Sequence, residues 1–364
     1  MFRKKMTISL VLILTLILMV EVAQADYTFG TPVNLGPPIN SEAPDASLAI
    51  SSDGLEMYLV TERPGGQGEA DICVAKRPTK SDPWGEPVNL GPTVNSSAWD
   101  AEPAISSDGL SLYFDSQRPG GQGESDIYVT TRPSKNDPWG TPVNLGEPVN
   151  TSSQDSEPFI TADGLELYFV SYRPDGYGES DIYMTKRPSK GDPWGEPVNL
   201  GPIINTPGWE GTPYLSSDGL KLFHYGFARE GAIGPVDIWM SSRATKDDEW
   251  ANCVVLGPEV NSPAVDTNPC LSYDGSILYF QSLRSGGLGE FDLWQVSIDP
   301  VVDLNGDGIV DSADMCIVVD NWGTDNQLCD VGPMPWGDGI VDVEDLIVLA
   351  EHLFEEFPPA EEVE

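Results

Sequence analysis

The sequence repeats itself with a period of 55 residues over most of its length. An Asp-Gly turn, usually Ser-Asp-Gly, recurs in steps of 55, 55, 55 and 56 residues, with its aspartate at Asp53, Asp108, Asp163, Asp218 and Asp274. A fixed period of this size is typical of propellers and solenoids, in which each repeat buries its apolar face against its neighbours. Five copies therefore organise nearly the whole chain.

Each repeat contains four short runs that we interpret as strands. In the second copy these are residues 102–105, 110–116, 126–131 and 142–145, and a Gly-rich loop at 119–123 separates the second run from the third. Runs rich in β-branched and aromatic residues, bounded by Gly, Pro, Asn and Asp, indicate strands and turns. Four antiparallel strands per repeat predict the blade of a β-propeller.

The two ends of the repeat region predict how the ring closes. The fourth-strand signature precedes the first turn, and its copies begin at Phe29, Trp84, Trp139, Trp194 and Trp250. The last repeat stops at its third strand, near Trp294. Pairing residues 29–35 with the strand near 292–297 would remove both unpaired edges. We therefore predict an all-β five-bladed propeller over residues 26–299, in which an N-terminal strand closes the last blade.

The first 25 residues have the pattern of a secretory signal peptide. Arg3, Lys4 and Lys5 precede an apolar run over residues 8–20, and Ala23-Gln24-Ala25 provides a small-x-small cleavage site. An uncleaved membrane anchor is the alternative, but the apolar run is short for a membrane span. We predict a secreted protein, extracellular, at the cell surface or periplasmic, whose mature chain starts at residue 26.

The charge is strongly acidic. Nineteen Lys and Arg against 58 Asp and Glu give a net charge of −39, which excludes a nucleic-acid phosphate binder and disfavours docking on anionic lipid. From residue 300 to 364 there are 17 acids and no Lys or Arg. We predict that a second, small domain occupies residues 300–364.

Cysteine and histidine add little. Five cysteines without metal-site spacing do not imply a disulfide framework, and whether Cys316 pairs with Cys329 stays open. The only two histidines are His224 and His352, so Ser-His-Asp catalysis or a His-rich zinc site has almost nothing to use. We interpret both histidines as structural.

The P-x-x-S-x-D-G, L-Y-F and D-I-Y runs, recurring in this order over about residues 29–298, resemble the WD40-like repeat of TolB-type bacterial propellers. The resemblance implies a propeller of a secreted or periplasmic protein. Its motif residues mostly form blades, so no catalytic residue is implied. TolB-type propellers are usually described with six blades, and the count of five here departs from them.

Charged residues recur on the face that carries the loops from fourth to first strand and from second to third strand. The first strands carry an acid in every blade, and two blades add Glu102 and Glu157 two residues later; the acids are Asp45, Asp100, Asp155, Glu210 and Asp266. A spacing of two predicts that both acids lie on one side of the strand. Unpaired carboxylates around one axis would repel each other unless a cation or ligand joins them, which favours a ligand or cation site.

Two further rings are more simply structural. An arginine ends each second strand and an aspartate opens each third strand, at Arg63, Arg118, Arg173, Arg229 and Arg284 and at Asp71, Asp126, Asp181, Asp237 and Asp292. Because every blade has both, we expect them to tie the intervening loop together.

A selective site is expected where the blades differ. Trp99 and Trp209 occupy a loop position that holds Pro, Gln or Val in the other blades, and Tyr172 and Tyr177 flank the Gly-rich loop of the third blade alone. Aromatic rings beside carboxylates are suited to sugar binding, although the rings could instead pack between loops. The predicted ligand-binding set is Asp45, Trp99, Asp100, Glu102, Asp155, Glu157, Trp209, Glu210 and Asp266.

The acidic C-terminal region contains an EF-hand type calcium loop at residues 303–314. It places oxygen donors at positions 1, 3, 5, 7, 9 and 12 and Gly308 at the sharp turn; the donors are Asp303, Asn305, Asp307, the Ile309 carbonyl, Asp311 and Asp314. An apolar stripe of Met315, Val318, Val319 and Trp322 predicts the following helix.

A second loop and helix follow, with an irregular first half. Trp336 and Met334 stand where acids belong, so we expect Asp330 to reach in across residues 331–336. The predicted second calcium set is Asp330, Asp338, the Ile340 carbonyl, Asp342 and Asp345, before a helix with Leu346, Leu349, Ala350 and Leu353 on one face.

Two such loop-helix units with Asp at position 12 and no preceding helices, over about residues 302–354, resemble a type I dockerin. The resemblance implies a small all-α domain with two calcium ions and a cohesin partner, usually attached to proteins that act on polysaccharides. Partner choice in dockerins is read after position 9, here at Ser312-Ala313 and Val343-Glu344, and the two pairs differ.

Two functions stay open for the propeller. One is a non-catalytic module that binds a glycan or a protein and is anchored by the dockerin-like domain. The other is a glycoside hydrolase that uses carboxylates of the propeller face, by analogy of fold with arabinanases and levansucrases. Acid and base roles need carboxylates in contrasting environments, whereas the acids here repeat from blade to blade. We therefore favour a non-catalytic binding function for the propeller and assign no catalytic residue.

Overall fold

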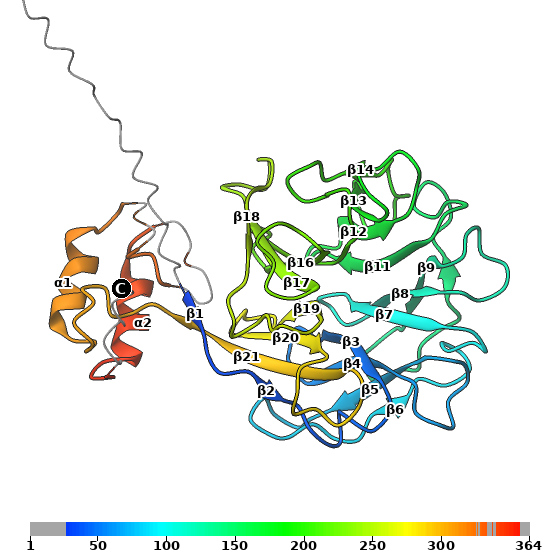
Figure 1. Cartoon of the computed structure of the whole chain (residues 1–364), viewed down its shortest axis with the longest axis horizontal. Helices are drawn as coiled ribbons and strands as arrows, with labels where there is room; N and C mark the ends of the chain where they lie inside the picture. Colours follow the sequence, from blue (N-terminus) through cyan, green and yellow to red (C-terminus); the bar gives the residue numbers. More distant parts are fainter. Residues whose placement is uncertain (1–26, 325, 327, 333–336, 338–339, 357–364) are drawn as a thin grey trace, which may run out of the picture.

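The computed structural model describes residues 27–324, 326, 328–332, 337 and 340–356 (Figure 1). The predicted signal peptide and the predicted mature terminus at residue 26 lie outside this part of the chain. Among the described residues, no helix is long and apolar enough to cross a membrane.

Five antiparallel sheets surround a central axis (Figure 1). Four of them consist of consecutive strands, as predicted from the repeat. In chain order these four blades are β3 (Asp45–Ile50), β4 (Glu56–Thr61), β5 (Asp71–Lys76) and β6 (Val88–Asn89); β7 (Asp100–Ile105), β8 (Ser111–Ser116), β9 (Asp126–Thr131) and β10 (Val143–Asn144); β11 (Asp155–Ile160), β12 (Glu166–Ser171), β13 (Asp181–Lys186) and β14 (Val198–Asn199); and β15 (Glu210–Leu215), β16 (Lys221–Phe227), β17 (Val236–Ser242) and β18 (Ala251–Val255).

The fifth blade joins the two ends of the repeat region, as predicted. Its own strands are β19 (Asp266–Leu271), β20 (Ile277–Ser282) and β21 (Asp292–Pro300). The N-terminal strands β1 (Tyr27–Phe29) and β2 (Val33–Asn34) both pair antiparallel with β21, with Val33 opposite Gln295 and Phe29 opposite Ile298. The five-bladed ring with N-terminal closure is therefore confirmed.

The apolar core lies between neighbouring blades. Val60 and Ile72 of the first blade pack with Phe114 and Tyr128 of the second, and the same arrangement recurs around the ring. Most residues of the second and third strands are buried on both faces, because neighbouring blades cover both sides of each sheet, and this explains their nearly continuous apolar sequence. The outer strands β2, β6, β10 and β14 are only two residues long, which limits pairing with other chains at the edges.

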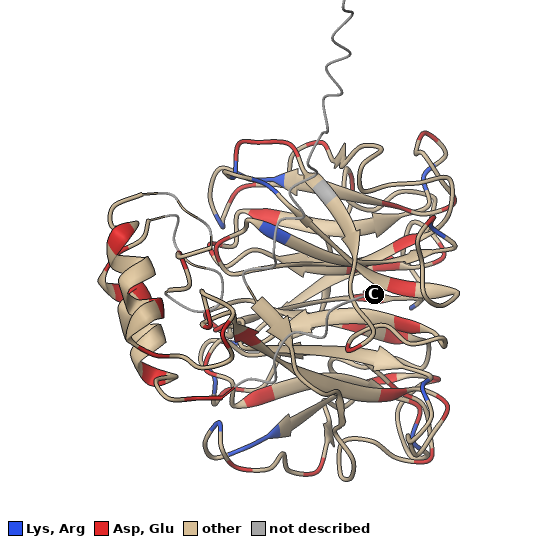
Figure 2. Cartoon of the chain, turned by 60° about the vertical axis from the view of Figure 1, so that its left-hand side comes forward, with Lys and Arg blue, Asp and Glu red and all other residues tan. Residues whose placement is uncertain are grey.

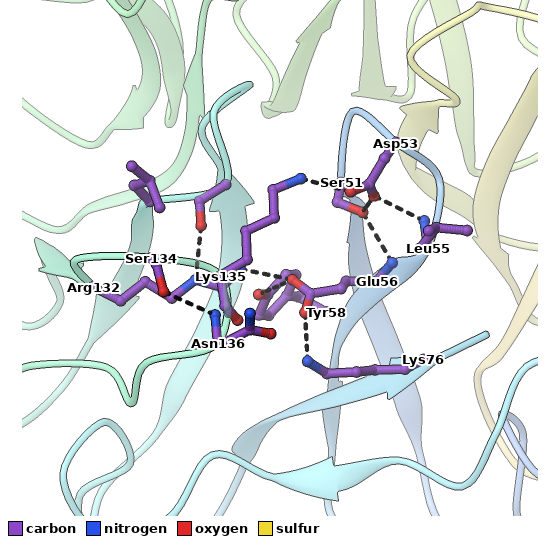
Figure 3. A network of polar contacts seen from close by, with 12 residues as sticks. Ser51, Asp53, Leu55, Glu56, Tyr58, Lys76, Arg132, Ser134, Lys135 and Asn136 are labelled. Atoms are coloured by element: carbon purple, nitrogen blue, oxygen red, sulfur yellow. Dashed lines mark hydrogen bonds and ion pairs between the residues drawn. The ribbon is translucent and has the colours of Figure 1, made fainter. Parts of the chain in front are cut away.

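The face that carries the Asp-Gly turns, here called the turn side, is fastened by contacts between blades (Figure 3). Arg132 of the second blade is nearly buried, stacks on Trp139 and bonds Glu56 of the first blade at 2.8 Å. Lys135 bonds Asp53 of the first blade at 2.5 Å. Lys80 contacts Asp274 and Lys190 contacts Asp108 in the same way. The opposite face, which carries the longer loops, is called the loop side.

Each innermost strand contains a bulge near its loop-side end. The register shifts after the second residue of β3, β7, β11, β15 and β19. The residue at the bulge has a positive φ in all five strands, from 38° to 53°, and is Ser47, Glu102, Glu157, Thr212 or Asn268. A bulge redirects the side chain that it contains. These five residues, here called the channel ring, therefore depart from the alternation of a regular strand.

The C-terminal unit contains two short helices, α1 (Ser312–Asp320) and α2 (Val343–Glu351), beside the propeller (Figure 1). Both begin with a capping box, in which an Asp caps the helix and the Asp three residues later returns the bond. Val318 and Leu349 are buried in its small core. Of the apolar stripe expected for α1, Val319 and Trp322 are instead exposed, because the two short helices cover only one side of each other.

Candidate functional site

The five acids at the start of the first strands do not face an open channel. Each acid is fully buried and faces the arginine of its own blade. The carboxylate oxygen lies within 3.0 Å of a guanidinium nitrogen in four of the pairs, and 3.9 Å from it in the pair Glu210–Arg229. The ring comprises the ion pairs Asp45–Arg63, Asp100–Arg118, Asp155–Arg173, Glu210–Arg229 and Asp266–Arg284. The expectation that these acids lack partners is wrong. Their placement makes them part of the blade scaffold.

The aspartates that open the third strands hold the adjacent Gly-rich loops, as expected for a structural ring. Asp126 accepts hydrogen bonds from the backbone N–H groups of Gln122 and Gly123, and Asp181 accepts them from Tyr177 and Gly178. The arginines, however, pair with the first-strand acids rather than with these aspartates. The two rings fasten different loops.

The expectation that Glu102 and Glu157 share a side of the strand with the first-strand acids is also wrong. Asp100 bonds Ser116 and Arg118 within its own blade, whereas Glu102 lies in the channel and contacts Ser47 and Asn268 of other blades. The bulge between positions 101 and 104 breaks the period of two on which the expectation rested.

The channel ring closes across the axis of the propeller. Asn268 donates to Ser47 Oγ at 2.6 Å and to the Glu102 carboxylate at 3.1 Å. The Thr212 hydroxyl lies 2.9 Å from the Glu157 carboxylate and 3.1 Å from Asn268 Oδ1, and it can donate to either. The cavity beside these residues has a volume of about 40 Å³, enough for a few water molecules, since one water molecule needs about 10–15 Å³. The channel ring thus narrows the channel between its loop-side and turn-side mouths.

Three carboxyl groups lie close together at the channel ring. Burial raises the pKa of Glu102 well above its usual range, and the neighbouring Glu157 and Asp115 raise it further. Burial likewise raises the pKa of Glu157. Burial, with the charges of Glu157 and Asp100, raises the pKa of Asp115 to about 7, although Ser125 donates to it at 2.8 Å. With a pKa of about 7, Asp115 is close to half protonated at neutral pH.

The raised pKa of Asp115 predicts a pH-dependent stability. A carboxyl whose pKa is higher in the folded than in the unfolded state stabilises fully below about pH 4, and the contribution is lost as pH rises through about 7. Asp115→Asn keeps the shape of the protonated group. We expect the variant to gain free energy of unfolding over the parent as pH rises from 5 to 7, by an amount on the order of 1 kcal/mol per pH unit, and the gain to level off from pH 7 to 8. Denaturant unfolding at pH 5, 7 and 8 measures it.

Asp108→Asn is the matched control for this measurement. Asp108 lies exposed on a turn, and Lys190, Ser106 and Leu110 lower its pKa to about 2, so it stays ionised over the whole range. The difference between the control and the parent should be constant from pH 5 to 8. An Asp115→Asn difference that is equally constant would contradict the protonation of the channel cluster.

Blade-specific aromatic side chains gather at the loop-side mouth. A backbone hydrogen bond joins the residue before each first strand to a residue at the C-terminal end of the second strand, and in the fourth blade this pair is Trp209 and Phe227. Their ring centroids are 4.8 Å apart, both are more than one-third exposed, and Trp209 Nε1 donates to Glu179. Tyr172 of the third blade and Leu283 of the fifth blade hold the position of Phe227 and are also exposed.

The predicted aromatic pair divides between two roles. Trp99 is half-buried and packs into the core between the first two blades, whereas Trp209 remains 42% exposed. Tyr177 is 53% exposed on its Gly-rich loop. Phe227 and Leu283 were missed, and aligning the five repeats at the C-terminal end of the second strand would have found them. Such an alignment would not have shown that Asn268 contacts Glu102, because the bulges bring the channel ring together.

In the first predicted calcium loop, two glycines have a positive φ and several acidic side chains accept hydrogen bonds from the loop backbone. Gly306 and Gly308 have φ of 73° and 90°, and the Asp303 carboxylate accepts from the backbone N–H of Gly306 and Gly308 at 2.9 and 2.8 Å. Asp314 is fully buried and bonds the N–H of Asn305 and Asp311. Asp307 bonds the N–H of exposed Ile309, and Asp311 caps α1.

The second loop is described only in part. Asp338 and residues 333–336 lie outside the described residues. Asp345 is fully buried and accepts from the N–H of Val331, Gly332 and Asp342 at 2.6 to 2.8 Å. A Cβ at Gly337 would lie 2.3 Å from Asp330 Oδ1, so Asp330 packs against this loop, and Ile340 is exposed.

The donor set of both loops consists only of oxygen, which is the chemistry that calcium prefers. In the described part of the chain, no three His, Cys, Asp or Glu side chains are gathered closely enough to form a metal site. The side chains instead accept hydrogen bonds from the loop backbone. The calcium sites stay a prediction.

Among the described residues, the cysteine and histidine side chains do not form a metal site. All five cysteines are free thiols, with Cys316 exposed and Cys329 buried. His224 is fully buried beside Cys253, and burial lowers its pKa to about 3. His352 lies 3.0 Å from Glu355. The structural interpretation of His224 agrees with its burial.

Comparison with solved structures finds other propellers. A glycoside hydrolase superposes with a TM-score of 0.50 at 8% identity, over 76% of this chain and 93% of that one. TolB from Acinetobacter baumannii gives 0.44 at 16% identity, over 75% of this chain and 64% of TolB. An α-L-arabinanase from Penicillium chrysogenum complexed with arabinobiose gives 0.47 at 15% identity, over 75% and 98%. This chain thus spans less than two thirds of the length of TolB.

No protein-family model matches the sequence, and no curated protein matches it. At such low identities the structural similarity shows the fold alone. The chain is a five-bladed β-propeller followed by two short C-terminal helices.

Proposed function

We propose that this protein is a secreted, non-catalytic module that binds a neutral glycan at the loop-side mouth of its propeller. The observation that carries the proposal is the group of exposed rings at that mouth, which only some blades possess. Trp209, Phe227 and Tyr172 interrupt the repeat on two neighbouring blades, next to the Glu179 carboxylate. Exposed aromatic surface beside polar acceptors suits the apolar faces and hydroxyl groups of sugar rings.

The arrangement of carboxylates disfavours a glycoside hydrolase. Hydrolysis needs two carboxyl groups on either side of the scissile bond, about 5–9.5 Å apart, with space for the sugar between them. The first-strand acids are buried in ion pairs with arginine. Glu102 and Glu157 have raised pKa values, as a general acid requires, but they hydrogen-bond Ser47 and Thr212 of the channel ring, and the cavity beside them has a volume of about 40 Å³. Hydrolysis by Glu102 and Glu157 is the alternative, and Glu102→Gln would abolish it.

Replacing the exposed tryptophan is expected to weaken glycan binding. Trp209→Ala removes the largest exposed ring at the loop-side mouth and leaves the blade core intact. We expect about tenfold weaker binding, or about 1.4 kcal/mol, to the polysaccharide that the parent retains best in affinity electrophoresis.

Trp322→Ala is the matched control, since Trp322 is 49% exposed on the C-terminal unit. Its retention should equal that of the parent. Equal retention of Trp209→Ala and the parent would refute the loop-side site. If the propeller binds a purified protein and no polysaccharide, its ligand is a protein and not a glycan.

For the C-terminal unit we propose a calcium-binding dockerin. The oxygen-only loops, the paired capping boxes and the absence of Lys and Arg from residue 300 onward support calcium. Asp303, Asn305, Asp307 and Asp314 would hold the first ion, and Asp330, Asp342 and Asp345 would contribute to the second. Calcium would supply positive charge to a segment that has none of its own. Exposed Val343 and Ile347 on α2 offer an apolar surface for a cohesin. Calcium-dependent binding to a purified type I cohesin tests the partner.

A further inference from the structure

A larger cavity lies at the turn-side mouth of the channel, on the face opposite the proposed glycan surface. Its volume is about 210 Å³, and all five blades line it through the same turn position, which is occupied by Ser52, Ser107, Ala162, Ser217 and Tyr273. None of the five channel-ring residues lines it. No residue of the proposed loop-side site lines it.

The cavity is open because a series of contacts between blades stops at the third blade. Ser52 Oγ donates to the carbonyl of Ser107, and Ser107 Oγ donates to the carbonyl of Ala162, at 2.6 and 2.5 Å. Ala162 has no hydroxyl with which to continue the series. The lysine contacts stop at the same place, since among the described residues no ion pair joins Lys246 to Asp163. The turns of the third, fourth and fifth blades therefore leave a space between them.

The lining combines rings, hydroxyls and balanced charge. Tyr214, which packs on Phe159 at 4.7 Å, and the 47% exposed Tyr273 supply aromatic surface. Ser217 supplies a hydroxyl group, whereas the hydroxyls of Thr161 and Ser216 donate to Asp163 and Asp218 of their own turns. The Ser217 hydroxyl can donate to and accept from a ligand that carries hydroxyl groups of its own.

The charges of the four ionisable residues in the lining, two acids and two bases, sum to zero. Arg243 is held by the carbonyls of Gly219 and Lys246 and stacks on Trp250. Glu166 is held by Lys186 at 2.7 Å. Asp163 and Lys246, both exposed, remain as one acceptor and one donor at the rim. A lining with two acids and two bases favours a neutral ligand over an ion.

We infer that this turn-side cavity binds one neutral monosaccharide unit. The volume is many times the about 10–15 Å³ that one water molecule needs and below the about 300–1,000 Å³ of pockets for larger ligands. A single sugar ring presents an apolar face to aromatic side chains and hydroxyls to Ser217, Asp163 and Lys246. The cavity thus adds a second carbohydrate site, for a free sugar or the end of a chain, on the face opposite Trp209.

The test is saturation-transfer NMR on the full chain with D-glucose, D-galactose, D-xylose and L-arabinose as probes. We expect at least one probe to bind saturably, with a dissociation constant of about 1 mM. Ser217→Tyr fills the mouth with the residue that the fifth blade already carries at this turn position, and it should weaken binding at least tenfold. Asp163→Asn removes an acceptor charge at constant volume and should weaken binding several-fold.

Trp209→Ala on the loop side is the control, and it should bind the probe as the parent does. The inference is overturned if none of the four sugars binds at a concentration of about ten times the expected dissociation constant. It is also overturned if Ser217→Tyr, shown to be folded by its thermal midpoint, and Asp163→Asn both bind as the parent does. Polysaccharide retention by the loop side is measured separately, so failure of one site leaves the other standing.

Discussion

Deletion of residues 26–36 is expected to cost the propeller more than about 3 kcal/mol of unfolding free energy. The deletion removes Tyr27, which is buried in the core of the fifth blade and whose burial contributes about 1.5–3 kcal/mol. It also removes the ladder between β2 and β21, including the bond from Leu35 N to the Leu293 carbonyl at 3.0 Å. The outer edge of β21 would then be unpaired, which favours aggregation. Guanidinium unfolding and light scattering measure both effects.

Val33→Ser is the matched control for the closing strand. Val33 lies on β2 opposite Gln295, but its side chain is 53% exposed, so the substitution leaves the ladder in place. Its unfolding free energy should stay within about 0.5 kcal/mol of the parent. A deletion variant as stable as Val33→Ser would show that the ring does not depend on its N-terminal strands.

Removal of calcium is expected to unfold the C-terminal unit while the propeller stays intact. Seventeen acids without a Lys or Arg repel one another, and two nine-residue helices bury too little apolar surface to hold a fold alone. A ligand that binds only the folded form at a thousandfold excess over its dissociation constant stabilises by about 4 kcal/mol. We expect amide exchange in α1 and α2 of the full chain to accelerate about a thousandfold in chelator.

Asp303→Asn and Asp320→Asn separate the calcium loop from general charge repulsion. Both variants remove one negative charge, but Asp320 is exposed at the end of α1, outside the loop. Asp303→Asn should weaken the protection by calcium at least tenfold, and Asp320→Asn should leave it unchanged. Exchange rates that are equal in calcium and in chelator would remove the calcium-binding and dockerin proposals together.

The blade count could be predicted from the sequence because closure leaves a local signal. The displaced fourth-strand copy at Phe29 and the missing one after Trp294 required each other, and the register of β2 on β21 follows directly. Strand positions were also predictable, since apolar runs and turn residues recur with one period. Local pattern decides these features, so no knowledge of distant contacts was needed.

The site residues were harder to predict because their surroundings come from several blades. A bulge in each innermost strand turns Glu102 and Glu157 away from the first-strand acids, and no local sequence signal marked it. The arginine partners of those acids lie about 18 residues away in the chain, as with Asp100 and Arg118, and two plausible partners were available. The third blade carries Ala162 where the first, second and fourth blades carry a serine, and the missing hydroxyl accompanies the turn-side cavity.

The most direct test of the proposed function is one assay of the purified full chain on a panel of neutral polysaccharides, which records retention and reducing-sugar release together. We expect saturable retention of at least one polysaccharide, reduced about tenfold by Trp209→Ala, and no release of reducing sugar above the blank. Release of sugar that Glu102→Gln abolishes would contradict the non-catalytic function and would make the channel carboxyls catalytic.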